Sequence, residues 1–310
     1  MGEVKPGQLA YFDGDFVPVS KAVVPITTHA FNYGTGCFEG IRAYWNPDRE
    51  QLFALRIAEH MDRLVRSARI LKLDFDMEVG TLIDLGLELL RRNEFREDAY
   101  LRPIVYKAEE TIKVALSGFQ TKFCAYAIPM GAYLDIDRGL SLTVSAWRRI
   151  EDNAMPSRAK PTGAYLNAAL ASDEARLRGY DEAVMLTSDG HVAEASSANL
   201  FIVMDGVVVT SEPADDILIG VTRDAVTKIV PRLGLAVDAR RIDRSELFAA
   251  DEVFLCGTGV QVAPVTNVDG RTIGSGKPGP VTMQIQERYL AIVRGFSDEF
   301  PDWRTPVYDG

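Results

Sequence analysis

The chain has 310 residues, which is above the size at which a single hydrophobic core usually stops growing, so we expect two domains. Its 47% hydrophobic and 25% charged residues are ordinary for a water-soluble globular protein. A formal net charge of -10 disfavours partners such as nucleic acids and anionic membranes.

Cysteine and histidine usage and the N-terminal sequence exclude further classes. Cys37, Cys124 and Cys256 show no CxxC spacing, and the three histidines show no HxxxH spacing, so we predict neither a metal site nor a disulfide framework. The first residues lack the apolar core of a secretion signal, and no apolar run is long enough to span a bilayer. These features predict a cytoplasmic protein.

The hydrophobic pattern predicts separate groups of strands and helices. Met61, Leu64, Val65 and Ala68 follow the i, i+3, i+4, i+7 rule of an amphipathic helix. Asp-Gly steps such as Asp205-Gly206 indicate hairpin turns. Segregated runs of this kind are typical of an α+β fold. The predicted helices are 57–72, 78–93, 163–178, 222–233 and 281–294, and the predicted strands are 99–107, 121–128, 142–147, 183–187, 199–204, 207–211 and 252–256.

A break in this pattern follows residue 128, where Pro129 and Gly131 interrupt the apolar run and polar residues come next. We therefore predict a smaller N-terminal domain over 1–128, a linker over 129–137 and a larger C-terminal domain over 138–310.

Three short segments contain residue types suited to binding or catalysis. Lys160 precedes Pro161, which favours an extended conformation at the lysine, although a lone lysine is more typical of the surface. The segment 219–224 leads into a predicted helix whose first N–H groups can form an anion site, although by itself the segment is more typical of a helix that Thr222 simply caps. The turn 256–259 lets backbone amides approach a ligand, or is a plain strand exit.

Two further positions have chemical character. Tyr100 and Arg102 lie two apart in a predicted strand, so both are expected on one face, where a guanidinium can bind a carboxylate or form a surface ion pair. Glu194 stands among small residues that leave room for a planar ligand, or it is a solvated strand residue. No GxGxxG, Walker or GxSxG motif is present, which removes the main support for dinucleotide, nucleotide and serine-hydrolase functions.

Taken together and in this order, the segments resemble a known family. They are YGTGCFEGIR at 33–42, Tyr100-Leu101-Arg102, Lys160 with Tyr165, Glu194 with Asn199-Leu200-Phe201, Gly220–Arg223 and Gly257-Thr258. The sequence is similar to the fold-type IV aminotransferases that use pyridoxal 5'-phosphate (PLP), and most of all to branched-chain amino acid aminotransferases. The resemblance implies two α/β domains joined by a short linker, an active site at their interface, and a homodimer or higher homo-oligomer.

The resemblance also implies a role for individual residues. Lys160 would bind PLP covalently and transfer protons, Glu194 would keep the pyridine nitrogen protonated, and Tyr165 would hydrogen-bond the phenolic oxygen. Arg102 would take the distal carboxylate of glutamate, and the amides of Thr258 and Gly259 would take an α-carboxylate. The implied phosphate ligands are Arg56, Val221, Thr222 and Thr258, and the implied substrate pocket comprises Tyr33, Phe38, Gly40, Tyr100, Arg102, Thr258 and Gly259.

The predicted function is PLP-dependent transamination of leucine, isoleucine and valine with 2-oxoglutarate. Three departures from the family pattern concern the substrate: the 107–114 loop reads KAEETIKV instead of a GxGV type, 163–165 reads Gly-Ala-Tyr, and 259–261 reads Gly-Val-Gln. They leave open an (R)-amine or D-amino acid transaminase, or a 4-amino-4-deoxychorismate lyase, on the same fold. A non-catalytic relative that binds a small ligand or a partner is the alternative from another class.

Overall fold

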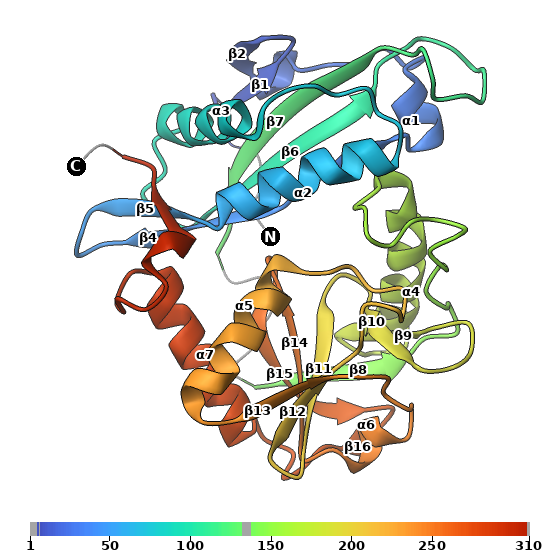
Figure 1. Cartoon of the computed structure of the whole chain (residues 1–310), viewed down its shortest axis with the longest axis vertical. Helices are drawn as coiled ribbons and strands as arrows, with labels where there is room; N and C mark the ends of the chain where they lie inside the picture. The colour runs from blue at the N-terminus through green and yellow to red at the C-terminus, as the bar shows by residue number, and fades with distance from the viewer. Residues whose placement is uncertain (1–4, 6, 132–137, 309–310) are drawn as a thin grey trace. The chain divides into compact units, whose positions relative to one another are not determined.

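The computed structural model describes residues 5, 7–131 and 138–308, and it divides into two compact units (Figure 1). The first unit contains the chain up to Gly131 together with Ala159–Gly163 and Ala291–Gly310, and the second contains the remainder up to Leu290. The linker predicted over 129–137 lies mostly outside the described residues. Each unit is discontinuous in sequence, because 159–163 and 291–310 pack with the N-terminal unit. The predicted domains 1–128 and 138–310 remain a prediction.

The first unit is built on an eight-stranded sheet with the order β17-β5-β4-β6-β7-β1-β2, and β3 pairs with β6. Figure 1 shows α2 and α3 beside this sheet. Its elements are β1 (Leu9–Phe12), β2 (Asp15–Pro18), α1 (His29–Tyr33), β3 (Gly36–Phe38), β4 (Ile41–Asn46), β5 (Gln51–Leu55), α2 (Ile57–Ile70), α3 (Val79–Arg92), β6 (Ala99–Lys107), β7 (Thr121–Pro129) and β17 (Arg304–Pro306), with short 3₁₀ turns at Val19–Lys21 and Pro301–Trp303.

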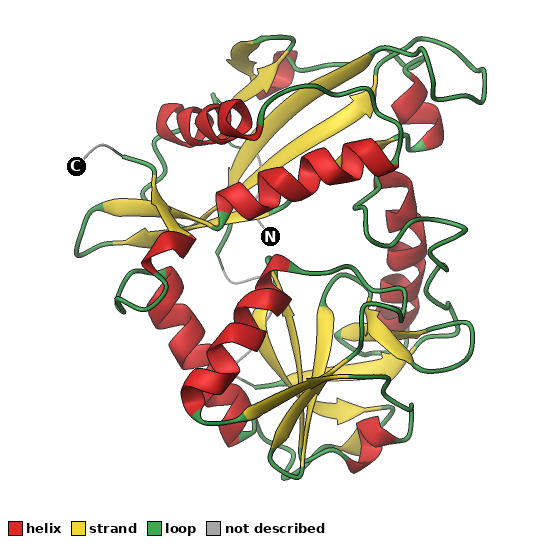
Figure 2. Cartoon of the chain, in the orientation of Figure 1, coloured by secondary structure: helices red, strands yellow, loops and turns green. Residues whose placement is uncertain are grey.

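The second unit is built on a nine-stranded sheet with the order β10-β9-β8-β15-β14-β11-β12-β13, and β16 pairs with β15. Figure 2 draws these strands in yellow, like those of the first unit, and shows the twist of this sheet. Its elements are β8 (Leu140–Val144), α4 (Tyr165–Leu177), β9 (Glu182–Leu186), β10 (Val192–Ala195), β11 (Asn199–Met204), β12 (Val207–Thr210), α5 (Val221–Ile229), β13 (Ala236–Ala239), α6 (Glu246–Ala249), β14 (Glu252–Gly257), β15 (Gln261–Val268), β16 (Arg271–Thr272) and α7 (Pro280–Val293), with a 3₁₀ turn at Val230–Leu233. Two elements include residues of both units: α7, which passes the division at residue 290, and a 3₁₀ turn at Thr162–Ala164.

The predicted apolar stripe of α2 is confirmed. Met61, Leu64 and Ala68 are at most 1% exposed, and they belong to the core of the first unit together with Leu82 and Leu90 of α3. Side chains three and four residues apart share one helix face, so burial of this stripe orients both helices on the sheet. Burial of each large apolar side chain is worth roughly 1.5–3 kcal/mol.

Two predicted elements end elsewhere than expected. The helix predicted over 222–233 is α-helical only to Ile229 and continues as a 3₁₀ turn, because Pro231 has no N–H for the α-helical ladder. The strand predicted over 142–147 occupies Leu140–Val144 instead. It leaves the sheet because the backbone N–H of Ala146 donates to the carboxylate of Glu174 on α4 rather than to a neighbouring strand.

The predicted Asp-Gly turns connect neighbouring strands. In the hairpin between β1 and β2 and in the one between β11 and β12, both turn residues have positive φ, which glycine tolerates and aspartate adopts more readily than most residues. Among the described residues, no helix combines the length and the apolar character needed to cross a membrane.

Candidate active site

Lys160 is fixed to the first unit by its backbone. The N–H of Phe38 in β3 donates to the carbonyl of Lys160 at 3.2 Å, and Pro161 forms an isolated bridge with Cys37. Thr162 follows and donates from Oγ1 to the carbonyl of Gly34 at 2.6 Å. The lysine side chain is half-buried, with Nζ 5.2 Å from the centre of the Phe38 ring. The amine is therefore held over an aromatic face at the end of β3.

Arg102 and Tyr100 join the same cluster, as their spacing predicts. Both extend from β6, and an Nη of Arg102 lies 2.6 Å from the hydroxyl of Tyr100. The guanidinium also stacks 4.2 Å from the centre of the Phe38 ring. The Nε of Arg102 is buried and meets no hydrogen-bond partner among the described residues. A buried guanidinium N–H of this kind needs an acceptor, and a ligand carboxylate is a suitable one.

Gly40 leaves the space that Tyr100 occupies. A Cβ built on Gly40 would lie 2.1 Å from the Tyr100 hydroxyl oxygen, which is closer than any real contact. A side chain at position 40 would therefore displace the hydroxyl that Arg102 contacts.

Tyr33 lies at the end of α1 and is 42% exposed. Its hydroxyl donates to the carbonyl of Ile112, and His29 Nε2 lies 3.1 Å from the carbonyl of Lys113. Two aromatic residues of α1 therefore hold the 107–114 loop, whose sequence departs from the family pattern.

A buried ionic cluster that the sequence did not indicate lies on α2 and the turn after β3. Glu39 is fully buried and accepts hydrogen bonds from Arg63 at 2.6 and 2.8 Å and from His60 Nδ1 at 2.7 Å. Burial alone would raise the pKa of Glu39, but the charge and hydrogen bonds of Arg63, together with His60, hold that pKa well below its usual range. Burial lowers the pKa of His60, and the nearby charge of Lys160 lowers it further.

Arg56, the arginine that the resemblance indicated, lies directly before α2 in a left-handed conformation. Its Nε lies 2.7 Å from Glu59, and its guanidinium is 5.0 Å from the Trp303 ring centre. Arg63 lies further along α2 and belongs to the Glu39 cluster. The charge of Lys160 acts on His60 of that cluster. No short sequence signal distinguished these two arginines in advance.

In the second unit, Glu194 of β10 is 5% exposed and surrounded by hydrogen-bond donors. An Nη of Arg149 lies 2.9 Å from Oε1, and the amide of Asn199 donates to Oε2 at 2.9 Å. The backbone N–H of Leu218 lies 3.3 Å from both oxygens. Glu194 is thus a buried carboxylate with several hydrogen-bond donors around it. The alternative prediction, that Glu194 is a solvated strand residue, is wrong.

The start of α5 lies beside this carboxylate. Asn199 also donates to the carbonyl of Leu218, just ahead of the helix, and a Cβ on Gly220 would meet its Oδ1 at 2.2 Å. The residue that caps α5 is Gly220, with no side-chain cap, so the simple capping role of Thr222 is wrong. Val221 and Thr222 instead form the buried first turn, whose N–H groups can bind an anion.

The turn at Thr258 and Gly259 also lies at this end of the sheet, because it follows Cys256, which pairs with Asn199 across β14 and β11. Tyr165 begins α4 and is half-buried. The structure therefore gathers one cluster around Lys160 in the first unit and a second around Glu194 in the second unit.

Comparison with protein families decides between the functional classes. Residues 36–268 match the family described as amino-transferase class IV, which is more than half of the chain. The chain belongs to the class IV aminotransferases. The predicted family and its α+β architecture of fold type IV are confirmed. The predicted cofactor is confirmed as well, because class IV aminotransferases use PLP.

Individual relatives of this family are similar over almost their whole length. A probable branched-chain-amino-acid aminotransferase of Aquifex aeolicus is 46% identical over 301 residues, which cover 97% of each chain. A branched-chain aminotransferase of Thermoproteus uzoniensis, solved with norvaline, is 42% identical with a TM-score of 0.93 over 97% of this chain and 99% of that one. A branched-chain amino acid aminotransferase of Thermobaculum terrenum, solved in its PLP form, is 32% identical with a TM-score of 0.93 over 98% of this chain and 99% of that one.

Proposed function

We propose that this protein transfers the amino group of L-leucine, L-isoleucine or L-valine to 2-oxoglutarate. The observation that carries the proposal is the cluster of Phe38, Tyr100 and Arg102 beside Lys160. The ring of Phe38 offers an apolar contact for an aliphatic side chain. The Nε of Arg102, which meets no hydrogen-bond partner in the described part of the chain, suits the second carboxylate of glutamate. An aromatic surface beside one arginine would suit both the branched-chain and the glutamate half-reaction.

The donor set fits PLP. When bound, the cofactor supplies an electron sink that stabilises negative charge at the substrate α-carbon. We assign the covalent attachment and the proton transfers to the amine of Lys160. When PLP is bound, the carboxylate of Glu194 would accept a hydrogen bond from the protonated ring nitrogen, and the hydroxyl of Tyr165 would donate to the phenolic oxygen.

The phosphate of PLP is assigned to backbone N–H groups and one arginine. The first turn of α5, with Val221 and Thr222, supplies amides and a helix dipole, and Thr258 supplies a hydroxyl. The resemblance indicated Arg56 as the arginine. We assign this role to Arg56, because Arg63 is already neutralised by the buried carboxylate of Glu39.

We assign the substrate to the residues that the resemblance indicates. The backbone amides of Thr258 and Gly259 take the α-carboxylate. The side chain lies among the residues already proposed for the pocket, which are Tyr33, Phe38, Gly40, Tyr100 and Arg102.

Replacing Arg102 is expected to separate the two half-reactions. In Arg102→Ala, the KM for glutamate should rise about 10- to 100-fold, the value of a charge-assisted hydrogen bond, while the KM for leucine changes little. Steady-state kinetics of each half-reaction measures the split, and Arg102→Lys, which keeps the charge, serves as the control. Equal effects on both substrates would show that Arg102 does not contact the distal carboxylate.

The first experiment is an absorbance spectrum of the PLP-loaded protein before and after L-leucine is added. Loss of the PLP absorbance band after leucine is added supports the proposal. Return of that band after 2-oxoglutarate is added shows the second half-reaction. Parallel samples with D-alanine and (R)-1-phenylethylamine test the alternative transaminases. A cofactor that responds to these compounds and not to leucine would refute the substrate assignment.

We also propose that the active form is at least a homodimer in the cytoplasm. Exposed apolar side chains gather where α1 and its preceding segment meet the 107–114 loop, and Phe31, Ile112 and Val114 are 69%, 82% and 85% exposed. A monomer rarely leaves such a patch uncovered. All three cysteines are free thiols, which suits a reducing compartment. Sedimentation analysis measures the oligomeric state.

A further inference from the structure

Glu194 is held by an arginine that is itself rigidly placed. The Arg149 side chain is 14% exposed, its Nη2 lies 2.9 Å from Glu194 Oε1, and its Nε donates to the carbonyl of Asp216 at 3.1 Å. The backbone N–H of Arg149 donates to the carbonyl of Leu186 in β9, the strand that pairs with β10. Both ends of the side chain are therefore fixed, and the guanidinium is pre-oriented toward the carboxylate.

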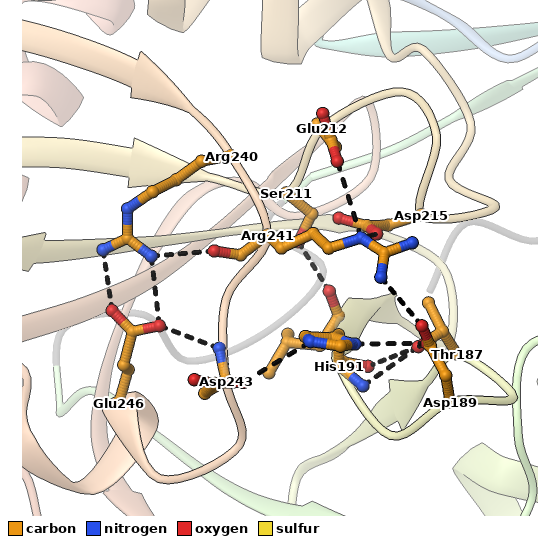
Figure 3. A network of polar contacts seen from close by, with 11 residues as sticks. Thr187, Asp189, His191, Ser211, Glu212, Asp215, Arg240, Arg241, Asp243 and Glu246 are labelled. Carbon is orange, nitrogen blue, oxygen red and sulfur yellow. Dashed lines mark hydrogen bonds and ion pairs between the residues drawn. The ribbon is translucent and has the colours of Figure 1, made fainter.

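The carbonyl that anchors Arg149 belongs to a loop with its own fixed conformation. Asp216 adopts a positive φ of 56°, and its carboxylate accepts the backbone N–H of Asp152 at 3.0 Å. The neighbouring Asp215 is 1% exposed and faces Arg241, with Oδ1 3.3 Å from Nε. Figure 3 shows Arg241 extending among Glu212, Asp215 and Asp189. This network holds the loop that presents the carbonyl to Arg149.

The same loop reaches Glu194 a second time, through the backbone N–H of Leu218. Glu194 therefore receives a charged donor from Arg149, an amide from Asn199 and a backbone amide from the loop. All three donors favour the ionised and oriented carboxylate over the neutral acid.

We propose that Arg149 is a positioning residue that keeps Glu194 an oriented carboxylate, so that the shared proton stays on the ring nitrogen of PLP. This inference rests on the proposed role of Glu194. Arg149 contacts the carboxylate directly, whereas its charge would act on the ring nitrogen only through that carboxylate. The positive charge therefore lowers the proton affinity of the carboxylate more than that of the ring nitrogen.

Loss of Arg149 is expected to move the proton toward Glu194. In Arg149→Gln, the ¹⁵N signal of labelled PLP should shift toward the unprotonated value by more than half of the shift seen in Glu194→Gln. The dissociation constant of PLP should rise about 10- to 100-fold, the worth of a hydrogen bond to a charged group. A purely structural role for Arg149 would not change the protonation of the ring nitrogen.

The test uses full-length protein reconstituted with ¹⁵N-labelled PLP and read by NMR, with PLP affinity measured by titration of the apoprotein. Arg148→Gln is the matched control, because Arg148 is the adjacent arginine, is exposed and contacts the carbonyl of Ser188 instead. It should leave the ¹⁵N signal and the affinity unchanged. Arg149→Lys keeps the charge without the double anchorage, so it should retain a protonated nitrogen and bind PLP more weakly.

The outcomes separate this inference from the proposed function. A wild-type signal in Arg149→Gln, beside a shifted signal in Glu194→Gln, would overturn the role of Arg149 alone. An unshifted signal in Glu194→Gln would overturn the role of Glu194 itself. If Arg149→Gln does not fold, as judged by circular dichroism, Arg149→Lys carries the test, and an unprotonated nitrogen in that variant contradicts the charge argument.

Discussion

Lys160→Ala is expected to reduce transamination of leucine with 2-oxoglutarate by about 10,000-fold or more. A positioned proton-transfer group contributes up to about this factor, and here the same amine also provides the covalent attachment of PLP. Initial rates under saturating PLP measure the loss. The backbone contacts of Lys160 with β3 do not involve its side chain, so the variant should fold.

The matched control for this experiment is Lys21→Ala, which removes an exposed lysine in the same unit. It should retain full activity. Cofactor content after exhaustive dialysis gives an independent measurement, because only wild type and the control should hold PLP covalently. A Lys160→Ala protein that keeps more than about a tenth of wild-type activity would show that another group performs the proton transfer.

Glu39→Gln is expected to lower the free energy of unfolding by about 3–5 kcal/mol. Glu39 is fully buried and neutralises Arg63, so the substitution leaves a guanidinium buried without its counter-charge. Urea denaturation of the apoprotein measures the change. Glu59→Gln is the control, because its pair with Arg56 is 42% exposed on the glutamate side and such pairs contribute about 0–1 kcal/mol. Similar losses in both variants would contradict the distinction.

The Glu39 cluster should also produce a specific pH dependence. The pKa of Glu39 lies below its ordinary value of 4.5 in the folded protein, so its stabilisation is fully present above about pH 4.5 and is lost as the pH falls through the lowered pKa. The difference in unfolding free energy between wild type and Glu39→Gln should therefore be largest at neutral pH and narrow in acid. A difference in unfolding free energy that grows as the pH falls would contradict the lowered pKa of Glu39.

Several elements could be predicted because their signals are local. The apolar spacing of Met61, Leu64 and Ala68 defined α2, and Gly179 and Gly234 ended helical segments in left-handed conformations that favour glycine. The two-residue spacing of Tyr100 and Arg102 placed both side chains in one cluster. Alternation along a strand and periodicity along a helix are properties of the backbone alone, so these features need no tertiary information.

The sequence by itself determined the reactive groups, namely the lysine, the carboxylate and the arginine, and the family to which they belong. Only the tertiary structure decided which charges meet. Arg149 and Glu194 are 45 residues apart, and Glu39 and Arg63 are 24 apart, yet each pair forms an ion pair in the fold. No local pattern specifies such pairings, because they depend on how separate elements pack. Burial then fixes their energetics, since an ionised group removed from water must find its counter-charge within the fold.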